Sequence, residues 1–536
     1  MKTKAAILSI AALSLATTMY AQQAASPFER PGERAYLVEK IKTLSSDEFA
    51  GRKPASAQEP MVINYIAKSF EEAGLQPGGE NGGWFQAVKL VSTMSSTKGG
   101  VLTIKTPKGK MSLKDMDDYV MWSNRAVSEI KLKGREYVFC GFGIDAPEFG
   151  WNDFEGVDVK DKIIVCMVGD PGIFDDNLFH GKNITYYARY TYKFEQARRM
   201  GAAGVMVVHN TRAASYGWNV VRNGASTAKQ ELCDDDMNMG DVAFKGWFTE
   251  ESASKLLSSC GYDPEKVFAD AKKPGFKSFV LKAKSDIALE VKSEISESHN
   301  VLGILPGTDL KDEYVLYAAH WDHLGVGLEI DGDSIYNGAA DNAAGTSLIM
   351  TIAKRFKESP IEHRRSLVFM ATTAEETGLL GGQYYCEHPI YPIEKTAAAI
   401  NIDGGAPESA THDISLRGAG TCELDQYLEA AATAQGRYIR KTYTDTAGIS
   451  YRTDLFNFVK VGIPGLLIGG GSDYVDKAAH DALPKINSYH MPNDEYHDWW
   501  PLDGTFASIS LYHSMGLMIA NADKMPQWLP GANFHR

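Results

Sequence analysis

The sequence predicts an α/β protein whose main domain has three layers, with helices covering both faces of a mixed, mainly parallel sheet. Two observations lead to this fold class: strand-like and helix-like segments alternate regularly after residue 299, and a second alternating region precedes them. Strands that alternate with helices form mainly parallel pairs, and the connecting helices cover both faces of the sheet. The length of 536 residues is a third observation. It exceeds one ordinary core and implies about two to four domains.

The regular alternation follows the segment HNVLGILPG. Short apolar runs are typical of buried strands, and apolar residues at three-to-four spacing are typical of helices. Strands are expected at residues 314–319, 366–373 and 398–402 and at GLLIGG, and helices at residues 345–357, 378–387 and near 423–435.

The middle of the chain predicts a separate α/β unit. The segments REYVFCGFGID and VKDKIIVCMVGD have the composition of strands, and YKFEQARRMGAAGVMVVHN predicts a helix, a glycine turn and a strand. Residues 95–135 carry short alternating runs typical of β-structure or loops. We therefore expect an inserted domain at residues 128–290, between an N-terminal segment at 22–127 and the main domain at 291–525.

The first 21 residues predict a secretory signal peptide. A basic start, Met1 to Lys4, precedes the short apolar run AAILSIAALSLATT, and Ala21 offers a cleavage point. No later run of 18 apolar residues occurs, so no membrane span is expected. The chain is therefore predicted to be exported, to the periplasm or the extracellular space.

The net charge and the cysteine content exclude some classes of function. The formal net charge of −13 argues against a nucleic-acid partner, because binding a polyanion needs a basic surface. The six cysteines form no C-x-x-C pattern, which excludes a cysteine-type zinc site. Cys140 and Cys166 lie in strand-like runs, where they either pair as a disulfide or remain buried free thiols.

Acids and histidines follow the predicted strands of the main domain. The residues concerned are His320, Asp322, Asp341, Glu375, Glu376, Asp403 and His490. A single acid at a helix N-terminus is explained by capping or by the helix dipole. Several such groups at one sheet edge need a counter-charge, because buried like charges are costly without one.

Two zinc ions would provide that charge, because zinc accepts imidazole nitrogen and carboxylate oxygen. Two histidines with three carboxylates carry −3, two Zn²⁺ ions carry +4, and a bridging hydroxide brings the sum to zero. Glu375 then remains to handle protons, and Asp322 lies on the same strand face as His320 and is expected to orient its imidazole. The sequence has no H-E-x-x-H, no G-x-S-x-G and no phosphate-binding loop motif.

The segments AHWDH, GAADNAAG, TTAEETGLLGG, NID and YHMPND resemble, in order and spacing, the motifs of the di-zinc exopeptidases of metallopeptidase family 28. The resemblance implies that residues 291–525 are a zinc peptidase domain and that the insert is a protease-associated domain. It implies that His320 and Asp403 hold one zinc, that Glu376 and His490 hold the other, and that Asp341 bridges them. Glu375 would be the general base and Asp322 the residue behind His320.

The resemblance also implies a cis peptide bond between Asp341 and Asn342. One departure is visible: Leu455 in YRTDLFNF stands where the family usually has a histidine that is not a metal ligand. Tyr451, nearby, is either a hydrogen-bond donor to the reacting oxygen or a packing residue.

The expected activity is that of an aminopeptidase, which hydrolyses N-terminal residues from peptides through a zinc-bridging hydroxide and a glutamate base. A carboxypeptidase or dipeptidase of the glutamate-carboxypeptidase type remains an alternative, as does a non-catalytic, receptor-like member of the fold. Arg452 and Arg364 are available to bind a terminal carboxylate, but nothing in the sequence places them in the pocket. The expected partners are peptide substrates, and the oligomeric state is left open.

Overall fold

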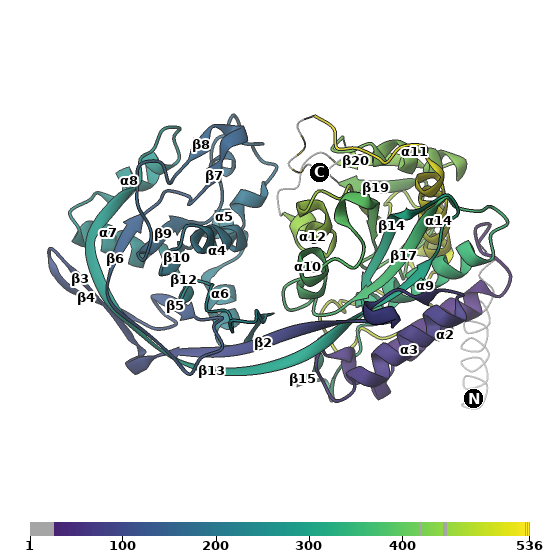
Figure 1. Cartoon of the computed structure of the whole chain (residues 1–536), viewed down its shortest axis with the longest axis horizontal. Helices are drawn as coiled ribbons and strands as arrows, with labels where there is room; N and C mark the ends of the chain where they lie inside the picture. Colours follow the sequence, from purple (N-terminus) through teal and green to yellow (C-terminus); the bar gives the residue numbers. More distant parts are fainter. Residues whose placement is uncertain (1–25, 418–419, 443–447, 531, 533, 535–536) are drawn as a thin grey trace, which may run out of the picture.

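A computed structural model describes residues 26–417, 420–442, 448–530, 532 and 534. The predicted signal peptide, residues 1–21, lies outside the described residues. Figure 1 shows two lobes connected by the long strands β2 (Phe85–Thr97) and β13 (Phe279–Leu305). We call residues 98–290 the insert lobe and the remaining described residues the large lobe.

The large lobe contains the predicted alternation of strands and helices. Its sheet runs in the order β18 (Thr396–Asn401), β14 (Leu310–His320), β17 (Arg365–Thr372) and β13. Both β2 and the short β1 (Gln76–Pro77) also pair with β13. β14 is parallel to both β17 and β18, whereas β13 is antiparallel to β17 and to β2. The mixed sheet, with its parallel pairs at the predicted strands, confirms the predicted fold class.

Helices cover both faces of this sheet, because successive strand side chains point to opposite sides. Val315, Tyr317 and Ala319 of β14 pack with helices on one face, and Leu316 and Ala318 pack with helices on the other. The first face carries α2 (Glu33–Leu44), α3 (Glu59–Glu72), α9 (Ala344–Lys357), α11 (Leu424–Ala434) and α14 (Asp503–Asn521). The second face carries α10 (Leu380–Glu387) and α12 (Leu455–Lys460). The three predicted layers are therefore present.

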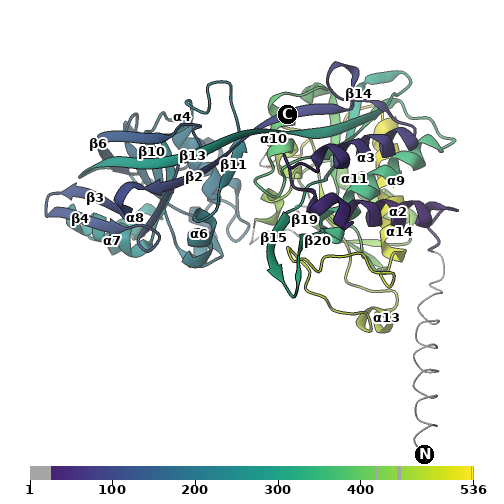
Figure 2. The same cartoon turned by 90° about the horizontal axis from the view of Figure 1, so that it is seen from below.

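The insert lobe repeats this arrangement on a smaller scale (Figure 2). Its parallel core is formed by β6 (Glu129–Phe139), β9 (Ile163–Met167), β10 (Gly204–Val208) and β12 (Phe244–Phe248), with β5 (Tyr119–Trp122) antiparallel at the edge. One face packs against α7 (Glu250–Ser259), and the other against α4 (Tyr190–Arg199) and α6 (Trp218–Ala225).

One domain boundary and the pairing of one strand differ from the expectation. The insert lobe contains β3 (Val101–Thr106), β4 (Gly109–Lys114) and β5, which lie before residue 128, because their side chains pack into its core. The segment GLLIGG forms β21 (Leu467–Gly469), but this strand pairs with β19 (Asp413–Arg417) in a separate three-stranded sheet with β20 (Tyr438–Thr442).

Cys140 and Cys166 are both buried free thiols, so the disulfide alternative is not realised. Among the described residues, no helix is long and apolar enough to cross a membrane.

Candidate metal centre

The predicted site residues meet at one edge of the large-lobe sheet. β14 ends at His320, which pairs in register with Thr372 at the end of β17. Glu375 and Glu376 follow β17 directly, and Asp403 follows the neighbouring β18. The carboxyl ends of parallel strands lie together, which explains how segments far apart in sequence form one site.

Asp341 lies between two histidines from different parts of the chain. Its Oδ1 atom is 3.3 Å from Nε2 of His320, and its Oδ2 atom is 3.2 Å from Nε2 of His490. Nε2 of His320 is also 3.5 Å from Oδ1 of Asp403, and Nε2 of His490 is 3.1 Å from Oε2 of Glu376. The five residues predicted as metal ligands therefore form one cluster, and the peptide bond between Asp341 and Asn342 is cis, as predicted.

Within this cluster, two groups of residues place ligand atoms within 4.8 Å of one another. One group is His320, Glu375 and Asp403, and the other is His323, Asp341 and Glu376. The sequence assigned no role to His323, although it ends the segment AHWDH. Its Nδ1 atom lies 2.7 Å from Oε1 of Glu376, so it faces the same carboxylate as His490.

The donor set fits zinc. His320 is 2% exposed, and its Nε2 atom has no hydrogen-bond partner among the described residues while it faces carboxylates of Asp341 and Asp403. Imidazole nitrogens and carboxylate oxygens are the ligands that zinc accepts in protein sites. The unpartnered nitrogen and the surplus of acids indicate a site built for a cation.

The electrostatics of the cluster are dominated by its acids. Burial would lower the pKa of His320, but Glu375, Asp341 and Asp403 together raise it well above its usual value. The pKa of His490 is likewise raised to about 10, because hydrogen bonds to Asp341 and Glu376 outweigh its burial. The acids of the cluster therefore favour positive charge at both imidazoles.

Asp322 is fully buried, but it contacts His320 differently from the expectation. Nδ1 of His320 is 3.1 Å from the backbone carbonyl of Asp322 and 3.8 Å from its carboxylate. The carboxylate instead accepts hydrogen bonds from the backbone N–H groups of Glu375 and Glu376, at 3.0 and 3.3 Å. The side chain of Asp322 therefore holds the backbone of Glu375 and Glu376, and its backbone carbonyl contacts the imidazole of His320.

Two further residues that sequence reasoning missed hold the site loops. Arg52 is fully buried beneath the cluster and donates to the carbonyls of Leu44, Trp321, Asn337 and Gly338. Residues 52 and 321 are far apart in the sequence, and no local sequence pattern predicts a contact between them.

Asp494 is the second of these residues. Its carboxylate accepts hydrogen bonds from the backbone N–H groups of Ala340, at 3.1 and 3.2 Å, and of Asp341, at 3.1 Å. It fixes the turn that carries Asp341. Its position within the YHMPND motif was the signal that could have identified it.

Glu375 borders the cavity of about 300 Å³ that the metal-ligand candidates line. Burial raises the pKa of its carboxyl well above the usual value, together with Asp454, Asp403 and Asp322, and His320 opposes this shift only in part. A raised pKa makes the carboxylate a stronger base toward a neighbouring proton donor.

The part of the chain that carries this site is similar to known proteins. The family model of peptidase family M28 matches residues 300–511. Aminopeptidase NAALADL1 from Mus musculus is 30% identical over 214 residues, which cover 38% of this chain and 26% of that protein. A glutamate carboxypeptidase 2 homolog from Caenorhabditis elegans is 26% identical over 251 residues, which cover 44% of this chain and 30% of that protein.

The chain thus spans less than a third of the length of these two curated relatives. Among solved structures, an aminopeptidase from Aneurinibacillus sp. strain AM-1 aligns over 92% of this chain and 95% of that chain, with 18% identity and a TM-score of 0.47. The region that matches the model of peptidase family M28, residues 300–511, contains every predicted metal ligand.

Proposed function

We propose that this protein is an aminopeptidase that holds two zinc ions and removes N-terminal residues from peptides. The observation that carries the proposal is the position of Asp341, whose two carboxylate oxygens face His320 and His490 at 3.3 and 3.2 Å. One carboxylate that faces two sets of ligands is the arrangement that a pair of metal ions requires. The curated aminopeptidase relative supports the same reaction class.

Each residue has a distinct part in this proposal. His320 and Asp403 would hold one ion, Glu376 and His490 the other, and Asp341 both. His323 lies beside Glu376 and would support the second group. When bound, the metal ions polarise the scissile carbonyl and lower the pKa of water.

Glu375 is the proposed general base. Its carboxyl lines the same cavity as the metal-ligand candidates, where it would accept a proton from the attacking water and pass that proton to the leaving amine nitrogen. Asp322 holds the backbone of Glu375 and so keeps its carboxyl in the cavity. The acid-rich lining also favours the ammonium group of a peptide N-terminus, which supports an aminopeptidase over a carboxypeptidase.

The test combines metal analysis with a substrate panel. We expect about two zinc ions per chain after reconstitution, and loss of activity with a chelator. Aminoacyl anilides should be cleaved, and N-terminally blocked peptides should not. One metal ion per chain would contradict the two-zinc site, and cleavage of blocked peptides from the C-terminus would contradict the aminopeptidase.

We further propose that residues 1–21 direct export and that the insert is a protease-associated domain. The basic and apolar start of the chain supports export. N-terminal sequencing of the mature protein from the periplasm or medium should begin at residue 22. Recovery of the intact N-terminus in the cytoplasm would contradict it.

A further inference from the structure

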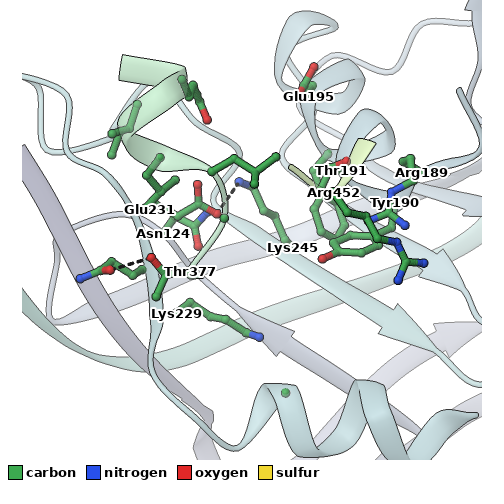
Figure 3. A pocket seen from close by; sticks show the side chains of 18 of the residues that line it. Asn124, Arg189, Tyr190, Thr191, Glu195, Lys229, Glu231, Lys245, Thr377 and Arg452 are labelled. Atoms are coloured by element: carbon green, nitrogen blue, oxygen red, sulfur yellow. Dashed lines mark hydrogen bonds and ion pairs between the residues drawn. The ribbon is translucent and has the colours of Figure 1, made fainter. Parts of the chain in front are cut away.

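The cavity of the metal centre borders a large cavity between the two lobes. This inter-lobe cavity has a volume of about 1060 Å³ and shares Glu375, Glu376 and His490 with the metal centre. Figure 3 shows its wall, which includes Thr377 of the large lobe and Lys245 of the insert lobe. Cavities of about 300–1,000 Å³ hold drug-sized ligands, so the inter-lobe cavity has room for several residues of a peptide.

A second, smaller cavity borders the metal centre through different residues, and we call it the side pocket. Its volume is about 190 Å³, and it shares Ala340, Ser488 and Asp494 with the metal centre. Among the described residues, none lines both the side pocket and the inter-lobe cavity. The metal centre therefore has two separate neighbouring spaces, one large and one small.

Apolar atoms form most of the wall of the side pocket. Leu483 and Ile486 come from the segment before His490, and Trp499 and Trp500 come from the segment after it. The prolines of the wall are Pro407, Pro484 and Pro501. An engineered apolar cavity of about 150 Å³ takes up benzene. The side pocket therefore has room for one aromatic ring or one branched aliphatic side chain.

The aromatic part of this wall is held in place by contacts within the protein. The ring of Trp499 stacks on that of His497, with the ring centroids 5.0 Å apart, and Trp500 is 4% exposed in the core of the large lobe. Nδ1 of His480 lies 3.0 Å from the hydroxyl oxygen of Ser409. A wall that is already ordered lowers the entropy cost of binding a ligand.

The acids of the side pocket have partners in the protein. The carboxylate of Asp494 accepts hydrogen bonds from the backbone next to the metal centre, and that of Glu495 accepts one from the side-chain amide of Asn337 at 2.8 Å. The lysine of the pocket, Lys485, is exposed to solvent. Because burial of a charged group is costly without a partner, the pocket favours an apolar side chain over a charged one.

The position of Glu375 indicates which part of a substrate enters each cavity. The scissile carbonyl carbon carries the leaving nitrogen on one side and the Cα atom of the N-terminal residue on the other. Glu375, the proposed proton donor to the leaving nitrogen, lines the inter-lobe cavity and not the side pocket. A peptide with its leaving nitrogen at Glu375 therefore extends into the inter-lobe cavity, which leaves the side pocket for the N-terminal side chain.

The sizes of the two cavities agree with this orientation. An aminopeptidase binds one residue before the scissile bond and a chain of variable length after it. The side pocket has room for a single side chain, whereas the inter-lobe cavity is several times larger.

We propose that the side pocket binds the side chain of the N-terminal residue and that the protein prefers peptides whose first residue is large and apolar, such as phenylalanine or leucine. Leu483 and Trp499 determine this specificity. Burial of the apolar side chain provides the driving force. The inference rests on the proposed aminopeptidase function and adds the class of N-terminal residue.

The test compares aminoacyl anilides that differ only in the N-terminal side chain. On the zinc-loaded protein, kcat/KM is measured for the phenylalanine, leucine, alanine, glutamate and lysine anilides. We expect the phenylalanine or leucine anilide to exceed the alanine anilide by about 10- to 100-fold, the range for burial of one such side chain. The glutamate and lysine anilides should fall below alanine, because the pocket offers their charges no partner within the fold.

Variants locate this preference in the side pocket. Leu483→Trp fills the pocket and should reduce the ratio of kcat/KM for phenylalanine to that for alanine to near one. Trp499→Leu removes a ring from the wall and should leave an intermediate ratio. Val475→Trp is the matched control, because Val475 is 56% exposed and lies outside the three cavities, so this variant should keep the wild-type ratio. Thermal melting and zinc analysis check that each variant is folded and loaded.

Three outcomes would overturn the inference or its basis. If the anilides are cleaved but the alanine, glutamate or lysine anilide is preferred, the assignment of the side pocket is wrong and the aminopeptidase function stands. An unchanged ratio in folded, zinc-loaded Leu483→Trp would place the preference in another part of the protein. If none of the anilides is cleaved, the proposed function fails, and the inference fails with it.

Discussion

Buried acids have different partners in the two lobes. In the insert lobe, Asp153 is 2% exposed and accepts hydrogen bonds from the backbone of Phe142 and Ile144 and from the ring N–H of Trp151, each at 3.0 Å. Asp241 in the same lobe pairs with Lys245 at 2.8 Å. Each acid thus obtains its donors from the chain itself.

The acids of the metal centre face imidazoles and one another. The fully buried Arg52 beneath them gives its N–H groups to backbone carbonyls and not to these carboxylates. A buried charged cluster is stable only when every charge is compensated. The buried acids of the insert lobe therefore have their donors within the fold, whereas the acids of the metal centre fit a bound cation as their counter-charge.

Replacing Asp341 should give the largest effect. Asp341→Ala removes the one carboxylate that faces both His320 and His490, so we expect both zinc ions to bind more weakly and activity to fall to background. His490→Ala should weaken mainly one ion. Elemental analysis after dialysis checks both variants, and retention of one ion at wild-type affinity in Asp341→Ala would contradict a bridging role.

Replacing Glu375 should affect turnover and leave the metals in place. Glu375→Gln keeps the shape of the side chain and removes the base, so kcat should fall by about 10²- to 10⁴-fold. Metal content should remain that of the wild type. Because Glu375 also lies in one group with His320 and Asp403, loss of a metal ion in this variant would show that it is a ligand.

Most of the large lobe could be predicted from sequence because its signals are local. The helix expected at 345–357 is Ala344–Lys357, and the strand expected at 398–402 is Thr396–Asn401. Each predicted ligand lies directly after a strand, before a helix or in a short motif, so strand order was enough to bring the ligands together.

What could not be predicted depends on contacts between distant segments. Arg52 lies under the site through a hydrogen bond that spans 269 positions, and no periodicity reports such a contact. The pairing of β21 with β19 depends on a strand that the sequence pattern did not identify.

The smallest expected effect concerns Lys193 of the insert lobe, which is buried and donates to the carbonyls of Gly169 and Tyr187 at 3.0 and 2.6 Å. Lys193→Met leaves both carbonyls unsatisfied, which costs about 1–3 kcal/mol each, but it also removes the cost of burying an ammonium group. We expect a net loss of roughly 1–3 kcal/mol in unfolding free energy, measured by denaturant titration, and unchanged zinc content. Lys255→Met, at an exposed pair with Glu251, is the control and should leave the unfolding free energy close to that of the wild type.

The pH dependence of this variant sharpens the comparison. Burial lowers the pKa of Lys193 from 10.5 to about 8, so between these values the unfolded chain binds a proton that the folded chain does not. The free-energy cost of burying Lys193 therefore falls as pH rises from about 8 to 10.5. The free energy of unfolding of the wild type should increase relative to that of Lys193→Met across this pH range. Unfolding curves at pH 7.5 and 10 measure the change. A constant difference would mean that Lys193 keeps its charge when folded, and a loss of zinc in the variant would mean that the insert lobe and the metal centre are coupled.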